Sequence, residues 1–139
     1  MLQHGVLVAL LDRKRWRGVL ILGPSGSGKS DLAFRLMSLG FVLVADDQVS
    51  LWLSGGRVFG RAPDALTGLM EAHGYGILNV PHRAFAAIEL IVDLTEEESE
   101  RMPEQATRDL IGVPVPLVRP RPREVTAAAK IRRWLMALG

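Results

Sequence analysis

The sequence predicts an α/β domain with a mixed β-sheet and a C-terminal helix. Apolar runs of strand length alternate with helical patterns along the chain. A glycine-rich loop joins one of these runs directly to a helix, which is the frame of a phosphate-binding loop. A hairpin signal near the middle of the chain favours antiparallel pairing beside parallel pairing. With 139 residues and no linker-like segment, we expect one domain over residues 1–139.

The first third of the chain predicts three buried strands and one helix. Runs of Val, Leu and Ile predict strands over residues 4–11, 18–22 and 41–45. Residues 12–17 are charged and predict a turn between the first two strands. A helix is expected to begin at Lys29 and to end at Gly40, because its apolar residues keep a helical spacing up to that glycine.

The middle of the chain predicts a hairpin, an irregular stretch and another strand. Residues 49–53 and 57–60 flank Ser54-Gly55-Gly56, a strong turn signal between two strands. Residues 63–80 contain three glycines and few clean periodicities, so a less regular stretch is predicted there. Alternating side chains predict a strand over residues 86–94.

The last third predicts a short helix, an edge strand and a closing helix. Thr95 and Glu98 have the spacing of a capping box that opens an acidic helix. Residues 113–118 are extended, and their two prolines favour the edge of a sheet. Alternating Arg and Pro in residues 119–123 exclude regular structure. Residues 124–138 predict an amphipathic helix, with one face formed by Val125, Ala128, Ile131, Leu135 and Leu138.

Composition excludes several classes of protein. The absence of cysteine excludes disulfides, thiolate metal sites and a cysteine nucleophile. A net charge of +2 gives little support for a nucleic-acid partner, and the arginines of residues 119–123 lack interleaved aromatic residues. No run approaches the roughly 20 apolar residues of a membrane span. The basic residues 13–17 follow the apolar stretch 6–11, which is the reverse of a secretory signal. We therefore expect a cytoplasmic protein that does not bind a membrane.

The glycine-rich loop carries the strongest functional signal. It reads Gly23, Pro24, Ser25, Gly26, Ser27, Gly28, Lys29 and Ser30. Its glycines allow a tight backbone whose N–H groups point at phosphate oxygens, and the following helix adds the positive end of its dipole. Lys29 can reach the outer phosphates, and the Ser30 hydroxyl can ligate Mg²⁺. The sequence therefore predicts a site for a nucleoside triphosphate with Mg²⁺.

Two adjacent aspartates, Asp46 and Asp47, end the apolar strand predicted over residues 41–45. Phosphoryl transfer needs a metal held by oxygen ligands and a group that orients the nucleophile. One aspartate could hold the Mg²⁺ shell while the other accepts the proton of the nucleophile. Taken alone, Asp47 is equally well explained as a turn residue or helix cap.

The roles of four further residues are ambiguous when the sequence pattern alone is considered. A lone histidine near a chain end, such as His4, is more often a surface or partly buried residue than a functional one. Glu71 and His73 lie in a segment whose Gly-x-Gly pair is weak evidence for close approach to a ligand. Arg101 follows an acidic helix start, where it would ordinarily be a solvated partner of a nearby glutamate.

In this order, the segments resemble the catalytic domain of the bacterial HPr kinase/phosphorylase family. Enzymes of this family phosphorylate a serine of the phosphocarrier protein HPr, and many of them also remove that phosphate by phosphorolysis. The matching residues are His4-Gly5-Val6-Leu7-Val8, the glycine-rich loop, Val44-Ala45-Asp46-Asp47, and residues 69–80, which are similar to the family signature Leu-Glu-Ile-Arg-Gly-Leu-Gly-Ile-Ile-Asn-Val. The resemblance implies a P-loop kinase-like core of the PEP-carboxykinase type, with ATP and Mg²⁺ as cofactors and HPr as partner. It also implies a hexamer. The chain resembles the short version seen in alphaproteobacteria, without the N-terminal domain of longer members.

The resemblance also implies roles for single residues. It assigns catalytic roles to Asp47, Lys29, His4 and Arg101. It places Ser30 and Glu71 at the metal, beside Asp46. Asp47 would be the base for phosphorylation and the acid for the reverse reaction, and Lys29 would stabilise the transferred phosphate.

Two departures from the family pattern leave the activity open. His73 stands where the family signature has arginine. Residues 118–123 lack the glycine and asparagine of a Pro-Gly-Arg-Asn segment that the family associates with phosphorolysis. A kinase with weak or no reverse activity is one hypothesis, and a nucleotide-responsive regulator with little catalysis is the other. A small-metabolite kinase or GTPase is disfavoured, because the sequence has no Asn-Lys-x-Asp segment and no long arginine-bearing lid.

Overall fold

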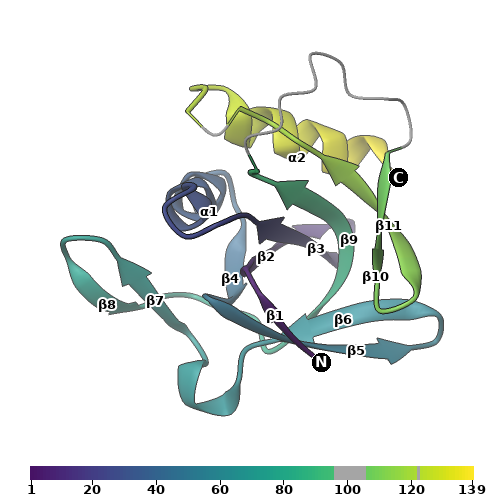
Figure 1. Ribbon diagram of the computed structural model, residues 1–139, viewed down its shortest axis with the longest axis horizontal. Helices are drawn as coiled ribbons and strands as arrows, with labels where there is room; N and C mark the ends of the chain where they lie inside the picture. The colour runs from purple at the N-terminus through teal and green to yellow at the C-terminus, as the bar shows by residue number, and fades with distance from the viewer. Residues whose placement is uncertain (96–105, 122) are drawn as a thin grey trace.

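A mixed, curled sheet organises the molecule (Figure 1). The computed structural model describes residues 1–95, 106–121 and 123–139, and within them nine strands form this sheet. They are β1 (Leu2–His4), β2 (Val6–Asp12), β3 (Arg15–Leu22), β4 (Val42–Ala45), β5 (Gln48–Ser54), β6 (Arg57–Arg61), β9 (Ala86–Asp93), β10 (Thr107–Leu110) and β11 (Val113–Val118). The main order is β1-β5-β6-β9-β3-β2-β4, with β11 paired to β9 and β10 paired to β11. Strand β9 is parallel to β3 and β11, and the other pairs are antiparallel. The predicted mixed sheet is confirmed.

Both faces of the central strands are buried, which explains their almost continuous apolar runs. Helices α1 (Lys29–Met37) and α2 (Ala127–Ala137) pack together on one face (Figure 1). Alternate residues of β2 divide between two cores: Val8 faces the helices, whereas Leu7 and Ala9 face a second core formed with β5, β6, β10 and β11. None of the helices in the described residues is both long and apolar enough to cross a membrane.

A separate hairpin occupies part of the stretch that the sequence left irregular. It consists of β7 (Leu69–Ala72) and β8 (Gly76–Asn79) and follows a short 3₁₀ turn, η1 (Asp64–Leu66). Figure 1 shows it projecting away from the main sheet. Gly74 and Gly76 have φ values of 85° and 92°, so the Gly-x-Gly pair serves the backbone of this turn. The prediction of irregular structure was wrong there, because β8 is exposed and lacks the apolar pattern of a buried strand.

Two other predicted boundaries were wrong. The charged turn between β2 and β3 is only two residues long, and Arg17 lies inside β3. There its guanidinium is buried and donates to Asp12 Oδ2 at 3.1 Å and to Glu89 Oε1 at 3.1 Å. The last helix begins at Ala127 rather than at residue 124, so Val125 precedes it and is 92% exposed instead of facing the core.

The edge position predicted for residues 113–118 holds for half of β11. Leu117 N–H donates to Ala106 O on the β10 side, so the nitrogens of Pro114 and Pro116 point to the opposite side. On that side, pairing with β9 begins only at Leu117. The prolines therefore lie where no ladder donor is required.

Candidate functional site

The glycine-rich loop, residues 23–30, connects the end of β3 to the first turn of α1. Gly26 and Gly28 have φ values of 81° and 98°, which side chains with a Cβ rarely adopt. A Cβ on Gly23 would lie 2.6 Å from Ser27 Oγ, so this position also needs glycine. The loop thus wraps tightly around the N-terminus of α1, where backbone N–H groups and the helix dipole favour an anion.

Lys29 is the first residue of α1 and is 8% exposed. Its Nζ donates hydrogen bonds to Gly23 O at 2.8 Å and to Pro24 O at 3.0 Å, which holds the side chain back across the loop. Burial lowers the pKa of Lys29, and the nearby carboxylates of Asp47 and Asp46 partly oppose this effect. The lysine and both aspartates therefore share one electrostatic environment.

Asp47 occupies a strained turn between β4 and β5. Gln48 N–H donates to Asp46 O at 2.8 Å, and Asp47 between them has a φ of 70°. This is the hydrogen bond and positive φ of a γ-turn, a rare and costly conformation for a residue other than glycine. Adjacent side chains on a straight strand would point to opposite faces, but this turn places both carboxylates on the wall of the same cleft.

Sheet register brings His4 to Asp47. Strand β1 pairs with β5 so that His4 faces Gln48, and β2 pairs with β4 so that Leu7 faces Ala45. Gly5, between β1 and β2, donates its N–H to Asp47 O at 3.0 Å. As a result, His4 Nδ1 lies 3.3 Å from Asp47 Oδ1, and both side chains are more than half exposed. The sequence alone favoured an incidental histidine, whereas the structure puts it against the proposed base.

Asp46 connects the strand end to the β7–β8 hairpin. Its Oδ2 accepts a hydrogen bond from Glu71 N–H at 3.0 Å. Burial raises the pKa of Asp46, and the carboxylates of Asp47 and Glu71 add to the rise, while the amides of Glu71 and Asp47 act against it. Glu71, which lies 25 residues beyond Asp46 in the sequence, is therefore close enough to influence the Asp46 carboxylate.

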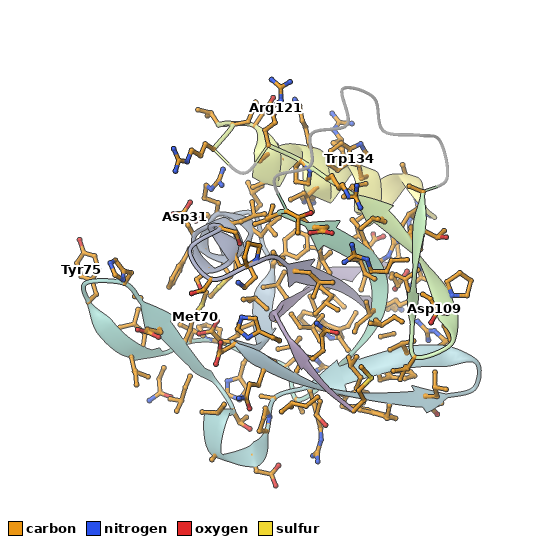
Figure 2. All side chains as sticks on the ribbon, viewed as in Figure 1. Asp31, Met70, Tyr75, Asp109, Arg121 and Trp134 are labelled. Carbon is orange, nitrogen blue, oxygen red and sulfur yellow. The ribbon has the colours of Figure 1, made fainter. Side chains whose placement is uncertain are left out.

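These residues line an open cleft of about 1180 Å³ between α1 and the β7–β8 hairpin. Figure 2 shows Asp31 on the α1 side, and Met70 and Tyr75 on the hairpin side. Of the predicted site residues, the cleft is lined by His4, Ser25, Gly26, Gly28, Lys29, Ser30, Asp46, Asp47 and Glu71. Gly23, Pro24 and Ser27 belong to the same loop but do not line it. Arg101 lies outside the described residues.

The hairpin also contributes His73, which the sequence left ambiguous, and two residues that sequence reasoning did not select. His73 and the exposed side chains of Tyr75 and Ile77 line the cleft. Ile77 pairs directly with Glu71, so the two share one face of the hairpin. The signal that could have revealed them is the register of this hairpin, which the weak pattern of β8 conceals.

The acidic groups fit the way in which proteins bind Mg²⁺ beside a nucleotide. Among the residues that the structure describes, no group of three or more His, Asp or Glu side chains is arranged to hold a metal by itself. Mg²⁺ usually takes only one or two carboxylates and completes its shell with phosphate oxygens and water. Asp46, Glu71 and the Ser30 hydroxyl, all on the cleft wall, match that limited set.

A third aspartate at a strand end, Asp93, is turned away from the cleft. It ends β9 opposite Leu22 of β3, directly before the glycine-rich loop. Its Oδ1 accepts a hydrogen bond from Thr95 N–H at 2.9 Å, and its Oδ2 pairs with the Arg108 guanidinium. Asp93 does not line the cleft, so its position next to the loop strand serves the fold.

Comparison with known proteins identifies one family. A family model described as HPr Serine kinase C-terminal domain matches residues 1–119. A protein named HPr kinase/phosphorylase from Polaromonas naphthalenivorans (strain CJ2) is 38% identical over 126 residues, covering 81% of this chain and 39% of that protein. A protein of the same name from Variovorax paradoxus (strain S110) is 39% identical over 126 residues, covering 81% of this chain and 38% of its own length. The chain thus spans about two-fifths of the length of these relatives.

A solved structure, the HPr(Ser) kinase/phosphatase from Coxiella burnetii, shares the fold. It matches with a TM-score of 0.79 and 23% identity, covering 99% of this chain and 92% of that one. The family model covers most of the chain, and the curated relatives cover 81% of it. This chain belongs to the family of the HPr Serine kinase C-terminal domain.

Proposed function

We propose that this chain forms the catalytic part of an ATP- and Mg²⁺-dependent kinase that phosphorylates a serine of HPr. The observation that carries the proposal is the convergence of Lys29, Asp46, Asp47 and Glu71 on one cleft beside the glycine-rich loop. Membership of the family and the name shared by its relatives support the choice of HPr as acceptor. A P-loop kinase-like core and a cytoplasmic location belong to the same proposal. A hexameric assembly stays a prediction.

Asp47 is the proposed general base. A serine hydroxyl is a weak nucleophile, and a carboxylate within hydrogen-bond reach can take its proton as the bond to phosphorus forms. The Asp47 side chain is 65% exposed, so an incoming hydroxyl can reach it from the open cleft. His4 lies against one carboxylate oxygen, Oδ1, and restricts the orientation of the group while the second oxygen can accept the proton.

The remaining residues of the site would stabilise the negative charge of the triphosphate. Lys29 would donate to the outer phosphate oxygens and stabilise the charge that develops on the transferred group. Asp46, Glu71 and Ser30 would hold Mg²⁺, which when bound neutralises the triphosphate. Lys29 is buried and Asp46 is half-buried, so their electrostatic interactions are stronger than those between fully solvated groups. Phosphorolysis, the reverse reaction, would use Asp47 as the acid and stays a prediction.

Substitution of the proposed base tests the function. With HPr, ATP and Mg²⁺, we expect the wild-type protein to form phosphoserine over many turnovers. Asp47→Asn should lower the rate of transfer by about 10²–10⁴-fold while ATP affinity, measured by calorimetry, stays close to that of the wild type. Asp64→Asn in η1 is the matched control, because Asp64 is exposed and does not line the cleft.

Two results would contradict the proposal in different ways. Transfer at the wild-type rate by Asp47→Asn would show that Asp47 is not the base. Tight ATP binding by the wild-type protein without any transfer to HPr would favour the nucleotide-responsive regulator. Repeating the assay on phosphorylated HPr with inorganic phosphate measures the reverse reaction separately.

A further inference from the structure

A second cavity flanks the glycine-rich loop. It has a volume of about 540 Å³ and is lined by residues 26–28 of the loop, by Asp31 and Arg35 of α1, and by Arg123 and Val125 from the segment before α2. It shares Gly26, Gly28 and Asp31 with the first cleft. Lys29 does not line it, and Asp31 is its only lining residue among the acidic residues of that cleft. The loop is therefore the common rim of two cavities with different chemistry.

We propose that this second cavity, the nucleoside pocket, holds the ribose and base of the bound nucleoside triphosphate. The inference rests on the proposed function, because that function fixes the direction of the triphosphate. The reacting phosphoryl group must lie where Lys29 and Asp47 can act on it, which is the first cleft. A triphosphate is an extended chain, so its nucleoside end lies away from the reacting phosphoryl group. The second cavity opens from the same loop glycines.

The walls of the nucleoside pocket suit an uncharged, planar group attached to an anion. Arg35 Nε lies 3.3 Å from Asp31 Oδ2, so the one carboxylate lining the pocket is paired with a cation. Arg35 Nη1 also donates to Glu124 O at 3.1 Å, which fixes the pocket wall between α1 and the segment before α2. A Cβ on Gly26 would meet no atom within 4 Å, so no other part of the protein covers the loop at this residue.

Arg123 and Val125 supply the contacts that a base needs. A guanidinium is planar and stacks on aromatic rings, and an aliphatic side chain can cover the opposite face. Val125 is 92% exposed although its spacing predicted a buried position on the last helix. Its apolar surface lies on the pocket wall beside Arg123. The volume of the pocket is within the usual range for small-molecule sites.

Calorimetry with two ligands separates nucleoside binding from phosphate binding. The probes are ATP and inorganic tripolyphosphate, each with Mg²⁺, and the readout is the ratio of their affinities. We expect the wild-type protein to bind ATP more tightly than tripolyphosphate. Arg123→Ala should lower this ratio about fivefold to tenfold, and Val125→Ser about threefold. Arg123→Lys should resemble Arg123→Ala, because it keeps the charge and loses the plane.

Arg121→Ala is the matched control. Arg121 belongs to the same Arg/Pro segment and is exposed, but it does not line the pocket, so the ratio should stay as in the wild type. An unchanged ratio in both Arg123→Ala and Val125→Ser, with folding verified by circular dichroism, would overturn the nucleoside pocket and leave the proposed kinase intact. Equal affinity of the wild-type protein for ATP and tripolyphosphate would overturn it as well. A wild-type protein that binds neither ligand would refute the proposed function itself.

Discussion

Replacing Asp93 by asparagine should destabilise the fold without touching the site residues. The Asp93 side chain is 2% exposed and connects the ends of three strands. It accepts from Thr95 N–H after β9, pairs with Arg108 on β10, and lies 4.0 Å from Arg119 Nε after β11. Asparagine has nearly the same shape and can still accept from Thr95 N–H. The substitution therefore removes mainly the negative charge between two arginines.

The magnitude follows from the burial of that charge. Removing one partner of a buried ion pair costs about 3–5 kcal/mol, because the other charge is left uncompensated. The Arg108 and Arg119 side chains are 34% and 30% exposed, so water compensates part of the loss. We expect a decrease of about 2–3 kcal/mol in the free energy of unfolding. For a chain of this length, that corresponds to a fall in Tm of roughly 6–9 °C.

The effect should depend on pH in a definite direction. Burial by itself would raise the pKa of Asp93, but the hydrogen bonds from Thr95 N–H and Arg108 outweigh it, so the pKa lies below its ordinary value. A carboxyl group with a lowered pKa in the folded protein stabilises it above the pKa of the unfolded chain, about 3.9. This stabilisation is lost as the pH falls through the lower, folded value. The difference between wild type and Asp93→Asn should be full at pH 7 and shrink below about pH 4.

Urea unfolding monitored by circular dichroism, repeated from pH 7 to pH 3, measures the difference. The control is Asp109→Asn on the same β10–β11 hairpin, where the carboxylate is exposed and accepts from Gly112 N–H at 3.2 Å. That substitution should change the stability by no more than about 0.5 kcal/mol. A loss below about 0.5 kcal/mol for Asp93→Asn at pH 7, or a difference that does not vary with pH, would refute this reasoning.

Three other substitutions test the site and the sheet. Asp46→Asn removes a carboxylate whose pKa is raised by burial. A carboxyl group with a raised pKa in the folded protein destabilises it as the pH rises above about 4. At pH 7 the variant should therefore have unchanged stability or a gain of up to about 1 kcal/mol in the free energy of unfolding, and a clear loss would contradict this. Gly18→Ala places a Cβ 2.4 Å from Ala87 O on β9, so urea titration should reveal a loss of about 3 kcal/mol, and wild-type stability would disprove the close approach. Lys29→Met should weaken binding of Mg²⁺-tripolyphosphate about 10–100-fold by calorimetry, with unchanged affinity as the opposing result.

Local chemistry made part of the site predictable. The glycine-rich loop is one continuous segment between a strand and a helix, and its function depends on backbone shape and helix polarity, both of which sequence spacing encodes. The position of Asp46 and Asp47 at a strand end is equally local. The sequence could not show how these two adjacent side chains reach one cleft, because that depends on the γ-turn and the φ of 70° at Asp47.

Weak patterns explain the wrong predictions. Arg17 was assigned to a turn because its neighbours are charged, yet Asp12 and Glu89 pair with it and allow it to be buried within β3. Val125 fits the helical spacing of α2 but lies before its first residue. Strand β8 is exposed throughout, so no alternation of apolar and polar residues revealed it.

The sequence by itself determined the mixed α/β class, the glycine-rich loop and the acidic end of β4, since each depends on contacts between near neighbours in the chain. Only the tertiary structure decided that His4 lies against Asp47, that Glu71 N–H binds Asp46, and that a second cavity shares the loop with the first cleft. These arrangements depend on strand register and on the packing of one hairpin and one turn against α1. Side chains brought together in this way are separated by tens of residues, and no local propensity records which of them will meet.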